Sequence, residues 1–362
     1  GLLLSGDAVC GLVIREGTTI SQVRAGAVVL CGGGFSGLLP RNDNIGENLG
    51  DCLALGLLSG AGLVDIEFIT FQPPGIAESG RRMDSIYSRA LVNAGRWFSP
   101  EGEPVDRSNL DAYYRARAEV VERFDNRYDL KCDLSEVAPR LQDDKQLAAA
   151  RDEFLPNWPL AELPVTICPL AHYTFGGLAI DEYGSTGVPG LFAAGECTGG
   201  IFGAGRPGGG ALADCLVFGA RAGEAAAELA AGPRPAPDLV VALKSVDVAA
   251  AAELRVEAGW AAWNYASLYK HARGLDEAGL WLRKLSDRLA ETPVTGPGLP
   301  GSTDAAVAVA VAQALVRASA LREESRGEHR RLDYPKADPA YASRPIHLGA
   351  ADVDLHTVTL EL

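Results

Sequence analysis

Near its start the chain alternates short apolar and polar residues, the pattern of β-strands with one buried face. Residues 8–14 and 19–23 follow this pattern, and Arg15-Glu16-Gly17 between them is a turn signal, so we expect a β-hairpin. Residues 27–30 are continuously apolar and are soon followed by Gly32-Gly33-Gly34. This run predicts a strand that is buried on both faces and stops at a glycine turn.

Further along, the spacing of apolar residues changes to that of helices. Residues 50–61 predict a helix that Asp51 opens, and residues 64–71 predict another strand. Between residues 74 and 164 the chain is rich in Arg, Asp and Glu, with helical stretches such as 111–123. This change of pattern indicates an inserted domain.

The second half of the chain returns to strands and then becomes helical. We expect strands and glycine-rich loops over 169–180 and 190–195, helices over 211–231, 249–290 and 305–324, a Pro-rich linker over 232–237 and an edge strand over 356–362.

Composition narrows the class of protein. The 362 residues include 33 Lys and Arg against 47 Asp and Glu, which gives a formal net charge of −14. Such an acidic chain is a poor partner for nucleic acid or for an anionic membrane surface. With 47% hydrophobic residues it is long enough for two or three globular domains, and its 42 glycines indicate tight turns or close approaches of backbone to a ligand.

The cysteines indicate a reducing compartment, and we expect a cytoplasmic protein without a metal site. They are odd in number and never stand in a CxxC or Cys/His ligand spacing. The first residues lack a basic region and a cleavage site, and no apolar run reaches the roughly 18 residues that a membrane span needs. The seven are Cys10, Cys31, Cys52, Cys132, Cys168, Cys197 and Cys215.

Two glycine-rich segments are candidates for a cofactor site. The first is Gly32-Gly33-Gly34, which taken alone is more often a plain turn. The second runs from Gly195-Glu196 through a glycine loop into a helix, with Arg206 as the single cation of the loop. A carboxylate, backbone N–H groups and a positive helix terminus together bind ribose-type hydroxyls and other polar ligand atoms. We therefore favour a ligand loop over a flexible loop with a solvated arginine.

A third candidate is the histidine in Ala171-His172-Tyr173-Thr174-Phe175-Gly176-Gly177. A histidine beside a Gly-Gly turn in apolar surroundings is usually a satisfied core residue. His172 is, however, one of five histidines and lies close in sequence to the glycine loop, which strengthens the case for a functional role.

In this order the motifs resemble those of one family over nearly the whole chain. The family is that of the flavoproteins of fumarate reductase, succinate dehydrogenase and L-aspartate oxidase. The segments that carry the resemblance are Leu30-Cys31-Gly32-Gly33-Gly34-Phe35, Leu49-Gly50-Asp51-Cys52, Glu67-Phe68-Ile69-Thr70-Phe71-Gln72-Pro73, the His172 segment, Gly190-Leu191-Phe192-Ala193-Ala194-Gly195-Glu196, Gly203-Ala204-Gly205-Arg206, Arg322-Glu323-Glu324-Ser325-Arg326-Gly327-Glu328-His329 and Asp333-Tyr334-Pro335.

The resemblance implies an α/β FAD-binding domain of an incomplete Rossmann-like, glutathione-reductase-like type. It also implies an inserted α+β capping domain and a C-terminal helical domain. The expected bounds are 1–74 and 166–235 for the FAD-binding domain, 75–165 for the capping domain, 236–345 for the helical domain and 346–362 for a terminal strand or tail.

The resemblance further implies the residues of the site. Those expected to bind FAD are Gly33, Gly34, Asp51, Gly195, Glu196, Ala211 and Leu212. His172 and Arg206 would hold the substrate carboxylate and polarise the reacting bond, with Thr70, Gln72 and Tyr173 as further substrate contacts. The family's proton-relaying arginine has no clean counterpart; Arg107, Arg115 and Arg117 are nearby candidates, and Arg117 is the one we assign although an exposed helix face suits Arg115 and Arg117 better.

Several positions depart from the family pattern. Gln72 replaces a substrate-binding histidine, Leu91 begins the segment that replaces Arg-Gly-Glu-Gly, and Phe202 replaces the histidine of His-Gly-Ala-Asn-Arg. Gly210-Ala211-Leu212 replaces Asn-Ser-Leu after the loop arginine. Either the substrate is not succinate, fumarate or aspartate, or activity has been lost.

The largest departure is that the family's first βαβ unit, with Gly-x-Gly-x-x-Gly for the ADP half of FAD, has no counterpart in the sequence. We expect a second polypeptide, encoded separately or produced by cleavage before Gly1, to supply it in a hetero-oligomer.

The resemblance implies an oxidoreductase subunit or cleaved chain that transfers a hydride between FAD and a carboxylate-bearing small molecule. One alternative is an L-aspartate oxidase or fumarate reductase proper. Another is a non-catalytic subunit that stabilises a flavoenzyme partner, which the departures favour and the presence of His172 and Arg206 disfavours.

Overall fold

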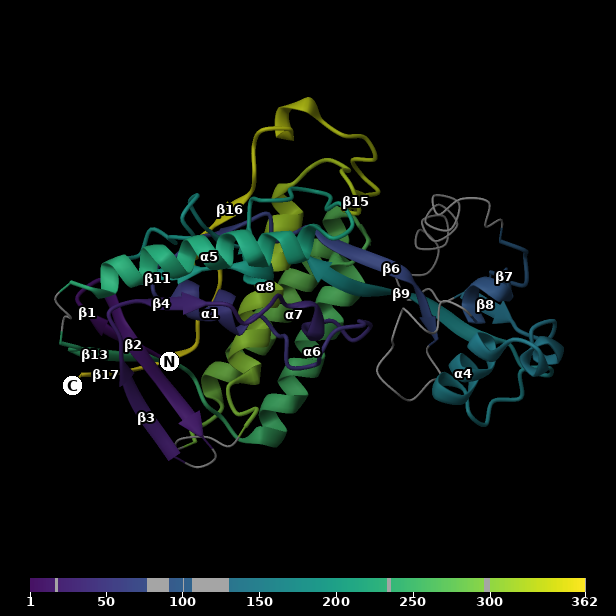
Figure 1. The fold of residues 1–362 in the computed structure, drawn as a ribbon, viewed down its shortest axis with the longest axis horizontal. Helices are drawn as coiled ribbons and strands as arrows, with labels where there is room; N and C mark the ends of the chain where they lie inside the picture. The colour runs from purple at the N-terminus through teal and green to yellow at the C-terminus, as the bar shows by residue number, and fades with distance from the viewer. Residues whose placement is uncertain are drawn as a thin grey trace. The chain divides into compact units, whose positions relative to one another are not determined.

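The computed structural model describes residues 1–16, 19–76, 91–99, 101–105, 130–232, 236–295 and 300–361 (Figure 1). The chain divides into two compact units. The first comprises Gly1–Pro40, Gly46–Thr70 and Tyr173–Leu362, and the second comprises Arg41–Ile45 and Phe71–His172.

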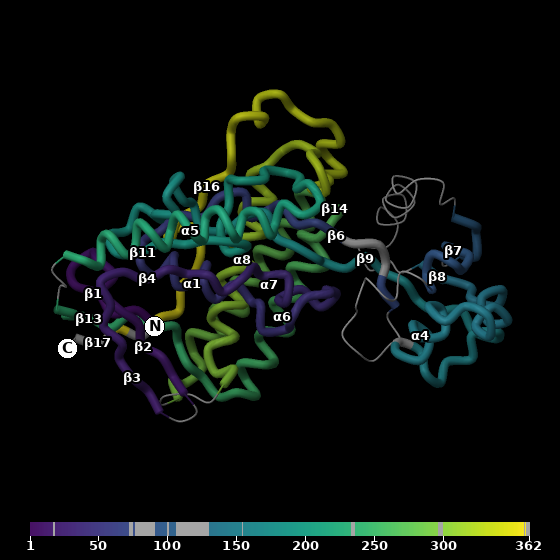
Figure 2. Tube along the Cα trace, in the orientation of Figure 1, coloured from purple at the N-terminus to yellow at the C-terminus, as the bar shows by residue number. Residues whose placement is uncertain are grey.

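A five-stranded antiparallel sheet of the first unit contains the strands nearest to both ends of the chain (Figure 2). Its order is β17 (Thr357–Glu361), β13 (Leu239–Leu243), β1 (Leu2–Ser5), β2 (Ala8–Glu16) and β3 (Thr19–Arg24). The predicted hairpin is confirmed, but the turn was placed too early. Arg15 and Glu16 still pair with Ile20 and Thr19, because an exposed two-stranded ribbon can extend without burying its polar residues.

The predicted buried strand is β4 (Val28–Leu30), which pairs in parallel with β11 (Leu191–Ala193). Helix α5 (Gly210–Ala230) lies along both strands in Figure 1, and it packs Ala222 and Ala226 against Phe192. Both strands end in glycine-containing segments, so the carboxyl edge of this pair leads directly into the two predicted cofactor segments.

The strand predicted over residues 64–71 is wrong as a single element. It consists of β5 (Leu63–Val64) and β6 (Ile69–Ile76), separated at Asp65, which has a φ of 57°. A non-glycine residue in the left-handed region cannot continue a strand. The short β5 belongs to a sheet of order β12 (Thr198–Gly199), β10 (Gly177–Ala179), β5 and β16 (His347–Leu348).

The helical part of the first unit contains α1 (Asp51–Leu58), α6 (Val248–Ala266), α7 (Ala272–Glu291) and α8 (Asp304–Leu321). The single helix expected over 249–290 is wrong, because β14 (Tyr269–Lys270) interrupts it to pair with β15 (Arg330–Arg331). His271 then caps α7 by accepting a hydrogen bond from the Gly274 N–H.

Helix α8 corrects the expectation that no apolar segment is long enough to span a membrane. Among the described residues it is the one helix long and apolar enough to cross a membrane by length and composition. In this fold 72% of that segment is buried. Its Ala and Val residues pack against α6 and α7, since small side chains allow the helices to approach closely.

The second unit is built on a sheet of order β6, β9 (Val165–Thr174), β8 (Leu130–Asp133) and β7 (Arg96–Phe98). Helix α4 (Lys145–Phe154) contributes Leu147 to the core of this unit. The helical stretch 111–123, with Arg107, Arg115 and Arg117, lies outside the described residues. The short 3-10 helices of the chain include η1 (Ser36–Leu38), η3 (Ala138–Gln142), η4 (Gly195–Cys197), η5 (Pro339–Tyr341) and η6 (Ala350–Asp352).

Candidate functional site

The glycines that follow β4 form a backbone cradle that excludes side chains. Gly33 has a φ of 81°, in the left-handed region that favours glycine. A Cβ on Gly34 would lie 2.1 Å from Thr174 Oγ1 and 2.5 Å from Glu196 Oε1. Any side chain at residue 34 would therefore displace Thr174 or Glu196.

Glu196 is held in place where β11 ends, in η4. Its Oε1 accepts hydrogen bonds from the Thr174 N–H at 3.1 Å and from Thr174 Oγ1 at 3.3 Å. Gly195 before it has a φ of 77°. The carboxylate is thus oriented by a residue of the His172 segment that the sequence analysis did not single out.

The start of α5 offers N–H groups to an external acceptor. Gly209 precedes the helix with a φ of 81°, and no side chain caps it. The N–H groups of Ala211 and Leu212 have no hydrogen-bond acceptor among the described residues. Leu212 is 68% exposed. This terminus is therefore open and carries the partial positive charge of a helix start.

Asp51 opens α1 after Gly50, as predicted. Gly50 has a φ of 97°, and a Cβ there would lie 2.9 Å from Val311 on α8. The start of α1 is thereby fixed against the helical part, and the Asp51 carboxylate is exposed at its first position.

Arg206 lies over an aromatic ring and keeps donors free. Its guanidinium carbon is 4.5 Å from the centroid of Tyr173. Its Nε is buried and has no partner within the described part of the chain, and Nη1 has a long contact of 3.5 Å to the Pro207 carbonyl. The guanidinium is therefore a cation that the described residues leave without a carboxylate partner, and its planar donors suit an anion such as a carboxylate.

The second unit positions the predicted histidine, His172. Asp43, which the sequence analysis missed, lies 2.9 Å and 3.0 Å from His172 Nδ1 through its two oxygens. Asp43 accepts from Nδ1–H, which leaves Nε2 as the ring nitrogen for other partners. The only signal in the sequence was the polar run Arg41-Asn42-Asp43-Asn44 after a proline, because the contact spans 129 positions.

The remaining residues predicted to contact the substrate lie on β6 or outside the described residues. Thr70 and Gln72 both belong to β6, the strand that follows Glu67 and Phe68. Arg117 lies outside the described residues.

Arg322, from the motif near the C-terminus, is the centre of a buried charge cluster. It binds Glu67, Glu324 at 2.9 Å and Asp65 at 3.6 Å, and its side chain is 2% exposed. Burial raises the pKa of Glu67 to about 7, even though Arg322 lowers it.

Lys270 and His329 extend this cluster. Lys270 Nζ is 3.1 Å from His329 Nδ1, and His329 Nε2 is 3.3 Å from the Arg322 carbonyl. Because lysine donates and a carbonyl accepts, the proton of the neutral imidazole is on Nε2. Burial lowers the pKa of Lys270 to about 7 and also lowers that of His329.

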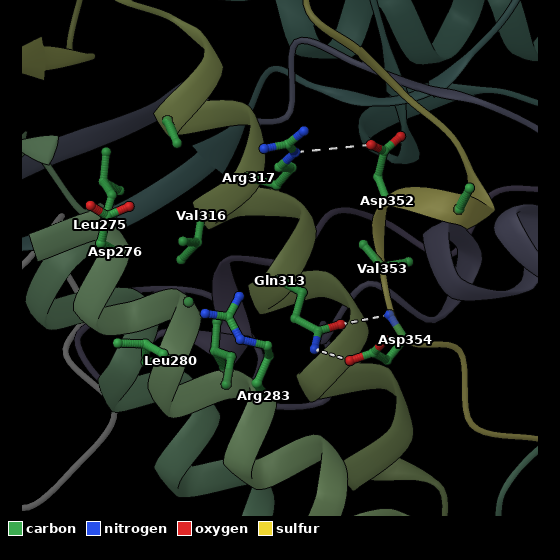
Figure 3. A pocket seen from close by; sticks show the side chains of 14 residues that line it. Leu275, Asp276, Leu280, Arg283, Gln313, Val316, Arg317, Asp352, Val353 and Asp354 are labelled. Carbon is green, nitrogen blue, oxygen red and sulfur yellow. Dashed lines mark hydrogen bonds and ion pairs between the residues drawn. The ribbon is translucent and has the colours of Figure 1, made fainter. Parts of the chain in front are cut away.

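A separate pocket of about 420 Å³ lies beside α7 and α8 (Figure 3). The Gln313 amide donates to Asp354 Oδ2 at 2.9 Å and accepts from the Asp354 N–H at 2.7 Å. Arg317 faces Asp352 at 3.9 Å. The polar groups on this side of the pocket fasten the segment 351–354 to α8, and none of the predicted site residues lines it.

The cradle suits a large polar cofactor with a planar part. Side-chain-free backbone at Gly33 and Gly34, an oriented Glu196 carboxylate and an open helix start are the donors and acceptors that a flavin's ribityl and ring atoms require. These residues therefore fit FAD.

Comparison with known proteins agrees with this chemistry. Residues 1–212 match the FAD binding domain family, and residues 255–359 match the fumarate reductase flavoprotein C-terminal family. The chain is 31% identical over 348 residues to a protein of Methanothermobacter marburgensis named as a subunit of fumarate reductase (CoM/CoB), covering 88% of this chain and 63% of that protein. It is 28% identical over 382 residues to the L-aspartate oxidase of Mycobacterium tuberculosis, covering 98% and 67%.

Solved structures give the same result. The Mycobacterium smegmatis Sdh1 structure in complex with UQ1 has a TM-score of 0.83 at 26% identity, covering 99% of this chain and 66% of that chain. The E. coli quinol fumarate reductase FrdA structure has a TM-score of 0.76 at 25% identity, covering 99% and 69%. The chain thus spans about two thirds of the length of these proteins. It belongs to the family of FAD-dependent oxidoreductases that contains the fumarate reductase, succinate dehydrogenase and L-aspartate oxidase flavoproteins, with their α/β FAD-binding, capping and helical domains, and its cofactor is FAD.

Proposed function

We propose that this chain forms the flavin cradle and the substrate-carboxylate contact of an oxidoreductase that moves a hydride between FAD and a small carboxylate. The observation that carries the proposal is Arg206, whose Nε edge has no acceptor among the described residues and which is joined by the same loop to the open start of α5. A fixed cation beside a cofactor binds the carboxylate and stabilises negative charge that develops during hydride transfer.

The cofactor residues follow from the cradle. Gly33, Gly34 and Gly195 let the backbone approach FAD, and Glu196 accepts hydrogen bonds from its hydroxyl groups. Asp51 contributes a second carboxylate, and the N–H groups of Ala211 and Leu212 donate to its polar ring atoms. When bound, FAD supplies the hydride acceptor or donor.

We assign substrate roles to residues of β6 and β9. His172, oriented by Asp43, donates or accepts through Nε2, and Tyr173 supports Arg206 from below the guanidinium. Thr70 and Gln72 are further substrate contacts, and Arg117 is the proposed proton donor. We also place the domain bounds at residues 74, 165, 235 and 345, as the sequence analysis expects.

A polypeptide partner is part of the proposal. Several relatives are named as subunits. We propose that this chain likewise works with a partner polypeptide. All seven cysteines are free thiols, which agrees with a reducing compartment, and we propose a cytoplasmic location. Native mass spectrometry tests the partner: a stable FAD-loaded species with the mass of this chain alone would exclude it.

A true fumarate reductase or L-aspartate oxidase is the second candidate, because relatives with these names match 88% or more of the chain. Direct assay of the purified protein with fumarate and with aspartate distinguishes it from a reductase or dehydrogenase of another carboxylate.

The main test is Arg206→Ala in the flavin-loaded protein. We expect flavin absorbance to persist and KM for the carboxylate substrate to rise at least about 100-fold, or turnover to be lost, because the charged hydrogen bonds disappear. Arg221→Ala is the matched control, since Arg221 is exposed on α5 and contacts the Glu182 carbonyl. Unchanged kinetics for Arg206→Ala would refute the proposed role.

A further inference from the structure

The loop that carries Arg206 is almost free of polar side chains. From Gly199 to Leu212 every residue except Arg206 is Gly, Ala, Ile, Phe, Pro or Leu. The loop therefore offers a ligand a single charged group, surrounded by apolar side chains and bare backbone.

An aromatic wall stands beside this charge. Phe202 packs edge-on against Tyr173, with ring centroids 6.3 Å apart, and lies 6.3 Å from the ring of Phe175. Phe68, Tyr173 and Phe175 are buried, whereas Phe202 and Ala211 remain partly accessible. The accessible part of the wall next to Arg206 is therefore apolar.

Charges of both signs lie near the wall: the buried Arg322 lies over the Phe68 ring, with its guanidinium carbon 4.6 Å from the ring centroid. Burial raises the pKa of Tyr173, and the carboxylates of Glu196 and Asp214 raise it further. Asp214 is 6% exposed, and its Oδ1 has no partner within the described part of the chain. On the loop from Gly199 to Leu212, a second anionic group in a ligand would meet the apolar ring of Phe202 rather than a side-chain donor.

We propose that this site selects a monocarboxylate with an apolar or aromatic group on the carbon skeleton next to the carboxylate, and that Phe202 is the residue that selects it. The inference rests on the proposed function, since it takes Arg206 as the carboxylate contact. Arg206 binds the one carboxylate, and the apolar substituent packs against Phe202. A dicarboxylate is disfavoured on the Phe202 side, because a second charge there loses water without gaining a side-chain donor from this loop.

The test is a titration of the flavin-loaded protein with two matched pairs of ligands. Binding is monitored through the change in flavin absorbance. The pairs are 3-phenylpropanoate with succinate, and cinnamate with fumarate. We expect the phenyl-bearing monocarboxylate of each pair to bind at least about 100-fold more tightly, as for an unpaired charge in an apolar site. Equal binding, or tighter binding of the dicarboxylates, would overturn the inference without the need for any variant.

Two substitutions at residue 202 sharpen the result. Phe202→His introduces a donor and should raise affinity for the dicarboxylates at least about tenfold while lowering affinity for the phenyl ligands. Phe202→Leu keeps an apolar side chain and should retain the monocarboxylate preference. If Phe202→His leaves the preference unchanged, Phe202 does not set it and this part of the inference is wrong.

Arg206→Ala separates this inference from the proposed function. If it leaves the binding of all four ligands unchanged, the carboxylate role of Arg206 is wrong and both proposals fall. If it weakens all four but the wild-type protein prefers dicarboxylates, only the inference about the substrate class is wrong.

Discussion

Two arginines of the first unit show opposite uses of a buried or half-buried charge. Arg322 is surrounded by carboxylates, with Glu67 and Glu324 bound directly, and its side chain is 2% exposed. Arg206 has no carboxylate partner among the described residues, and its Nε is buried without an acceptor. Removal of one partner from a buried charge pair destabilises the fold, whereas a charge held in place without a counterion can bind a ligand.

The largest effect should follow from breaking the paired cluster. Arg322→Ala leaves Glu67 buried without its counterion and leaves Glu324 paired with Arg326 alone, so we expect the free energy of unfolding to fall by about 3–5 kcal/mol. Urea denaturation measures it. Arg317→Ala is the control, because its pair with Asp352 is exposed at 3.9 Å and should contribute less than about 1 kcal/mol. Equal losses in the two variants would contradict the assignment of Arg322 as a structural charge.

The pH dependence of the free energy of unfolding tests the same cluster, with a smaller expected effect. The folded protein retains the Glu67 proton up to pH about 7, whereas the unfolded chain releases it near 4.5. Across this range the folded state keeps the Glu67 proton, so the contribution of Glu67 to stability falls as pH rises, by up to roughly 1.4 kcal/mol per pH unit. His329, whose pKa is lowered, contributes in the opposite direction below pH about 6.5. Lys270, whose folded pKa is lowered from 10.5 to about 7, adds a rise in stability only above pH about 7.

Glu67→Gln removes the titrating group. Its unfolding free energy, measured by denaturation at intervals from pH 4.5 to 7, should lack this part of the slope. An identical slope in the wild-type protein and the variant would show that Glu67 does not hold a proton in this range.

A substitution in the cradle should affect the cofactor. Gly34→Ala places a methyl group 2.1 Å from Thr174 Oγ1 and 2.5 Å from Glu196 Oε1, so the carboxylate must move. We expect the dissociation constant for FAD to rise at least about tenfold, or roughly 1.4 kcal/mol. The flavin-to-protein ratio after dialysis measures it. Gly205→Ala is the control, because nothing lies within 4 Å of a Cβ there. Loss of flavin from both variants alike would contradict a specific cradle at Gly34.

The sequence predicted the parts of the fold that local pattern determines. The strand at 28–30 and the helix at 210–230 were placed within about two residues, since a continuous apolar run and an Ala-rich amphipathic stretch leave few alternatives. The prediction of secondary structure from the sequence failed where a strand or helix is interrupted without a Gly or Pro that would signal the break. Asp65 divides a strand through a positive φ, and the pairing of Tyr269 with Arg330 divides a helix.

The sequence predicted those residues of the candidate site that belong to a recognisable local motif. Arg206 and Glu196 were found because a charged residue in a glycine-rich segment is conspicuous. Asp43 was missed, since its contact with His172 joins segments 129 positions apart and no local pattern encodes it. Phe202 was seen only as a departure from a family motif, because its packing against Tyr173 is a tertiary contact.

The most direct test of the distinction between the two arginines is to measure unfolding and carboxylate binding on the same preparation of flavin-loaded Arg206→Ala. The variant should lose less than about 1 kcal/mol of unfolding free energy, since the fold loses little beyond the ring contact with Tyr173. Its dissociation constant for the carboxylate should rise at least about 100-fold, or roughly 2.7 kcal/mol. A variant that loses more than about 2 kcal/mol of stability while binding the carboxylate as before would contradict the account.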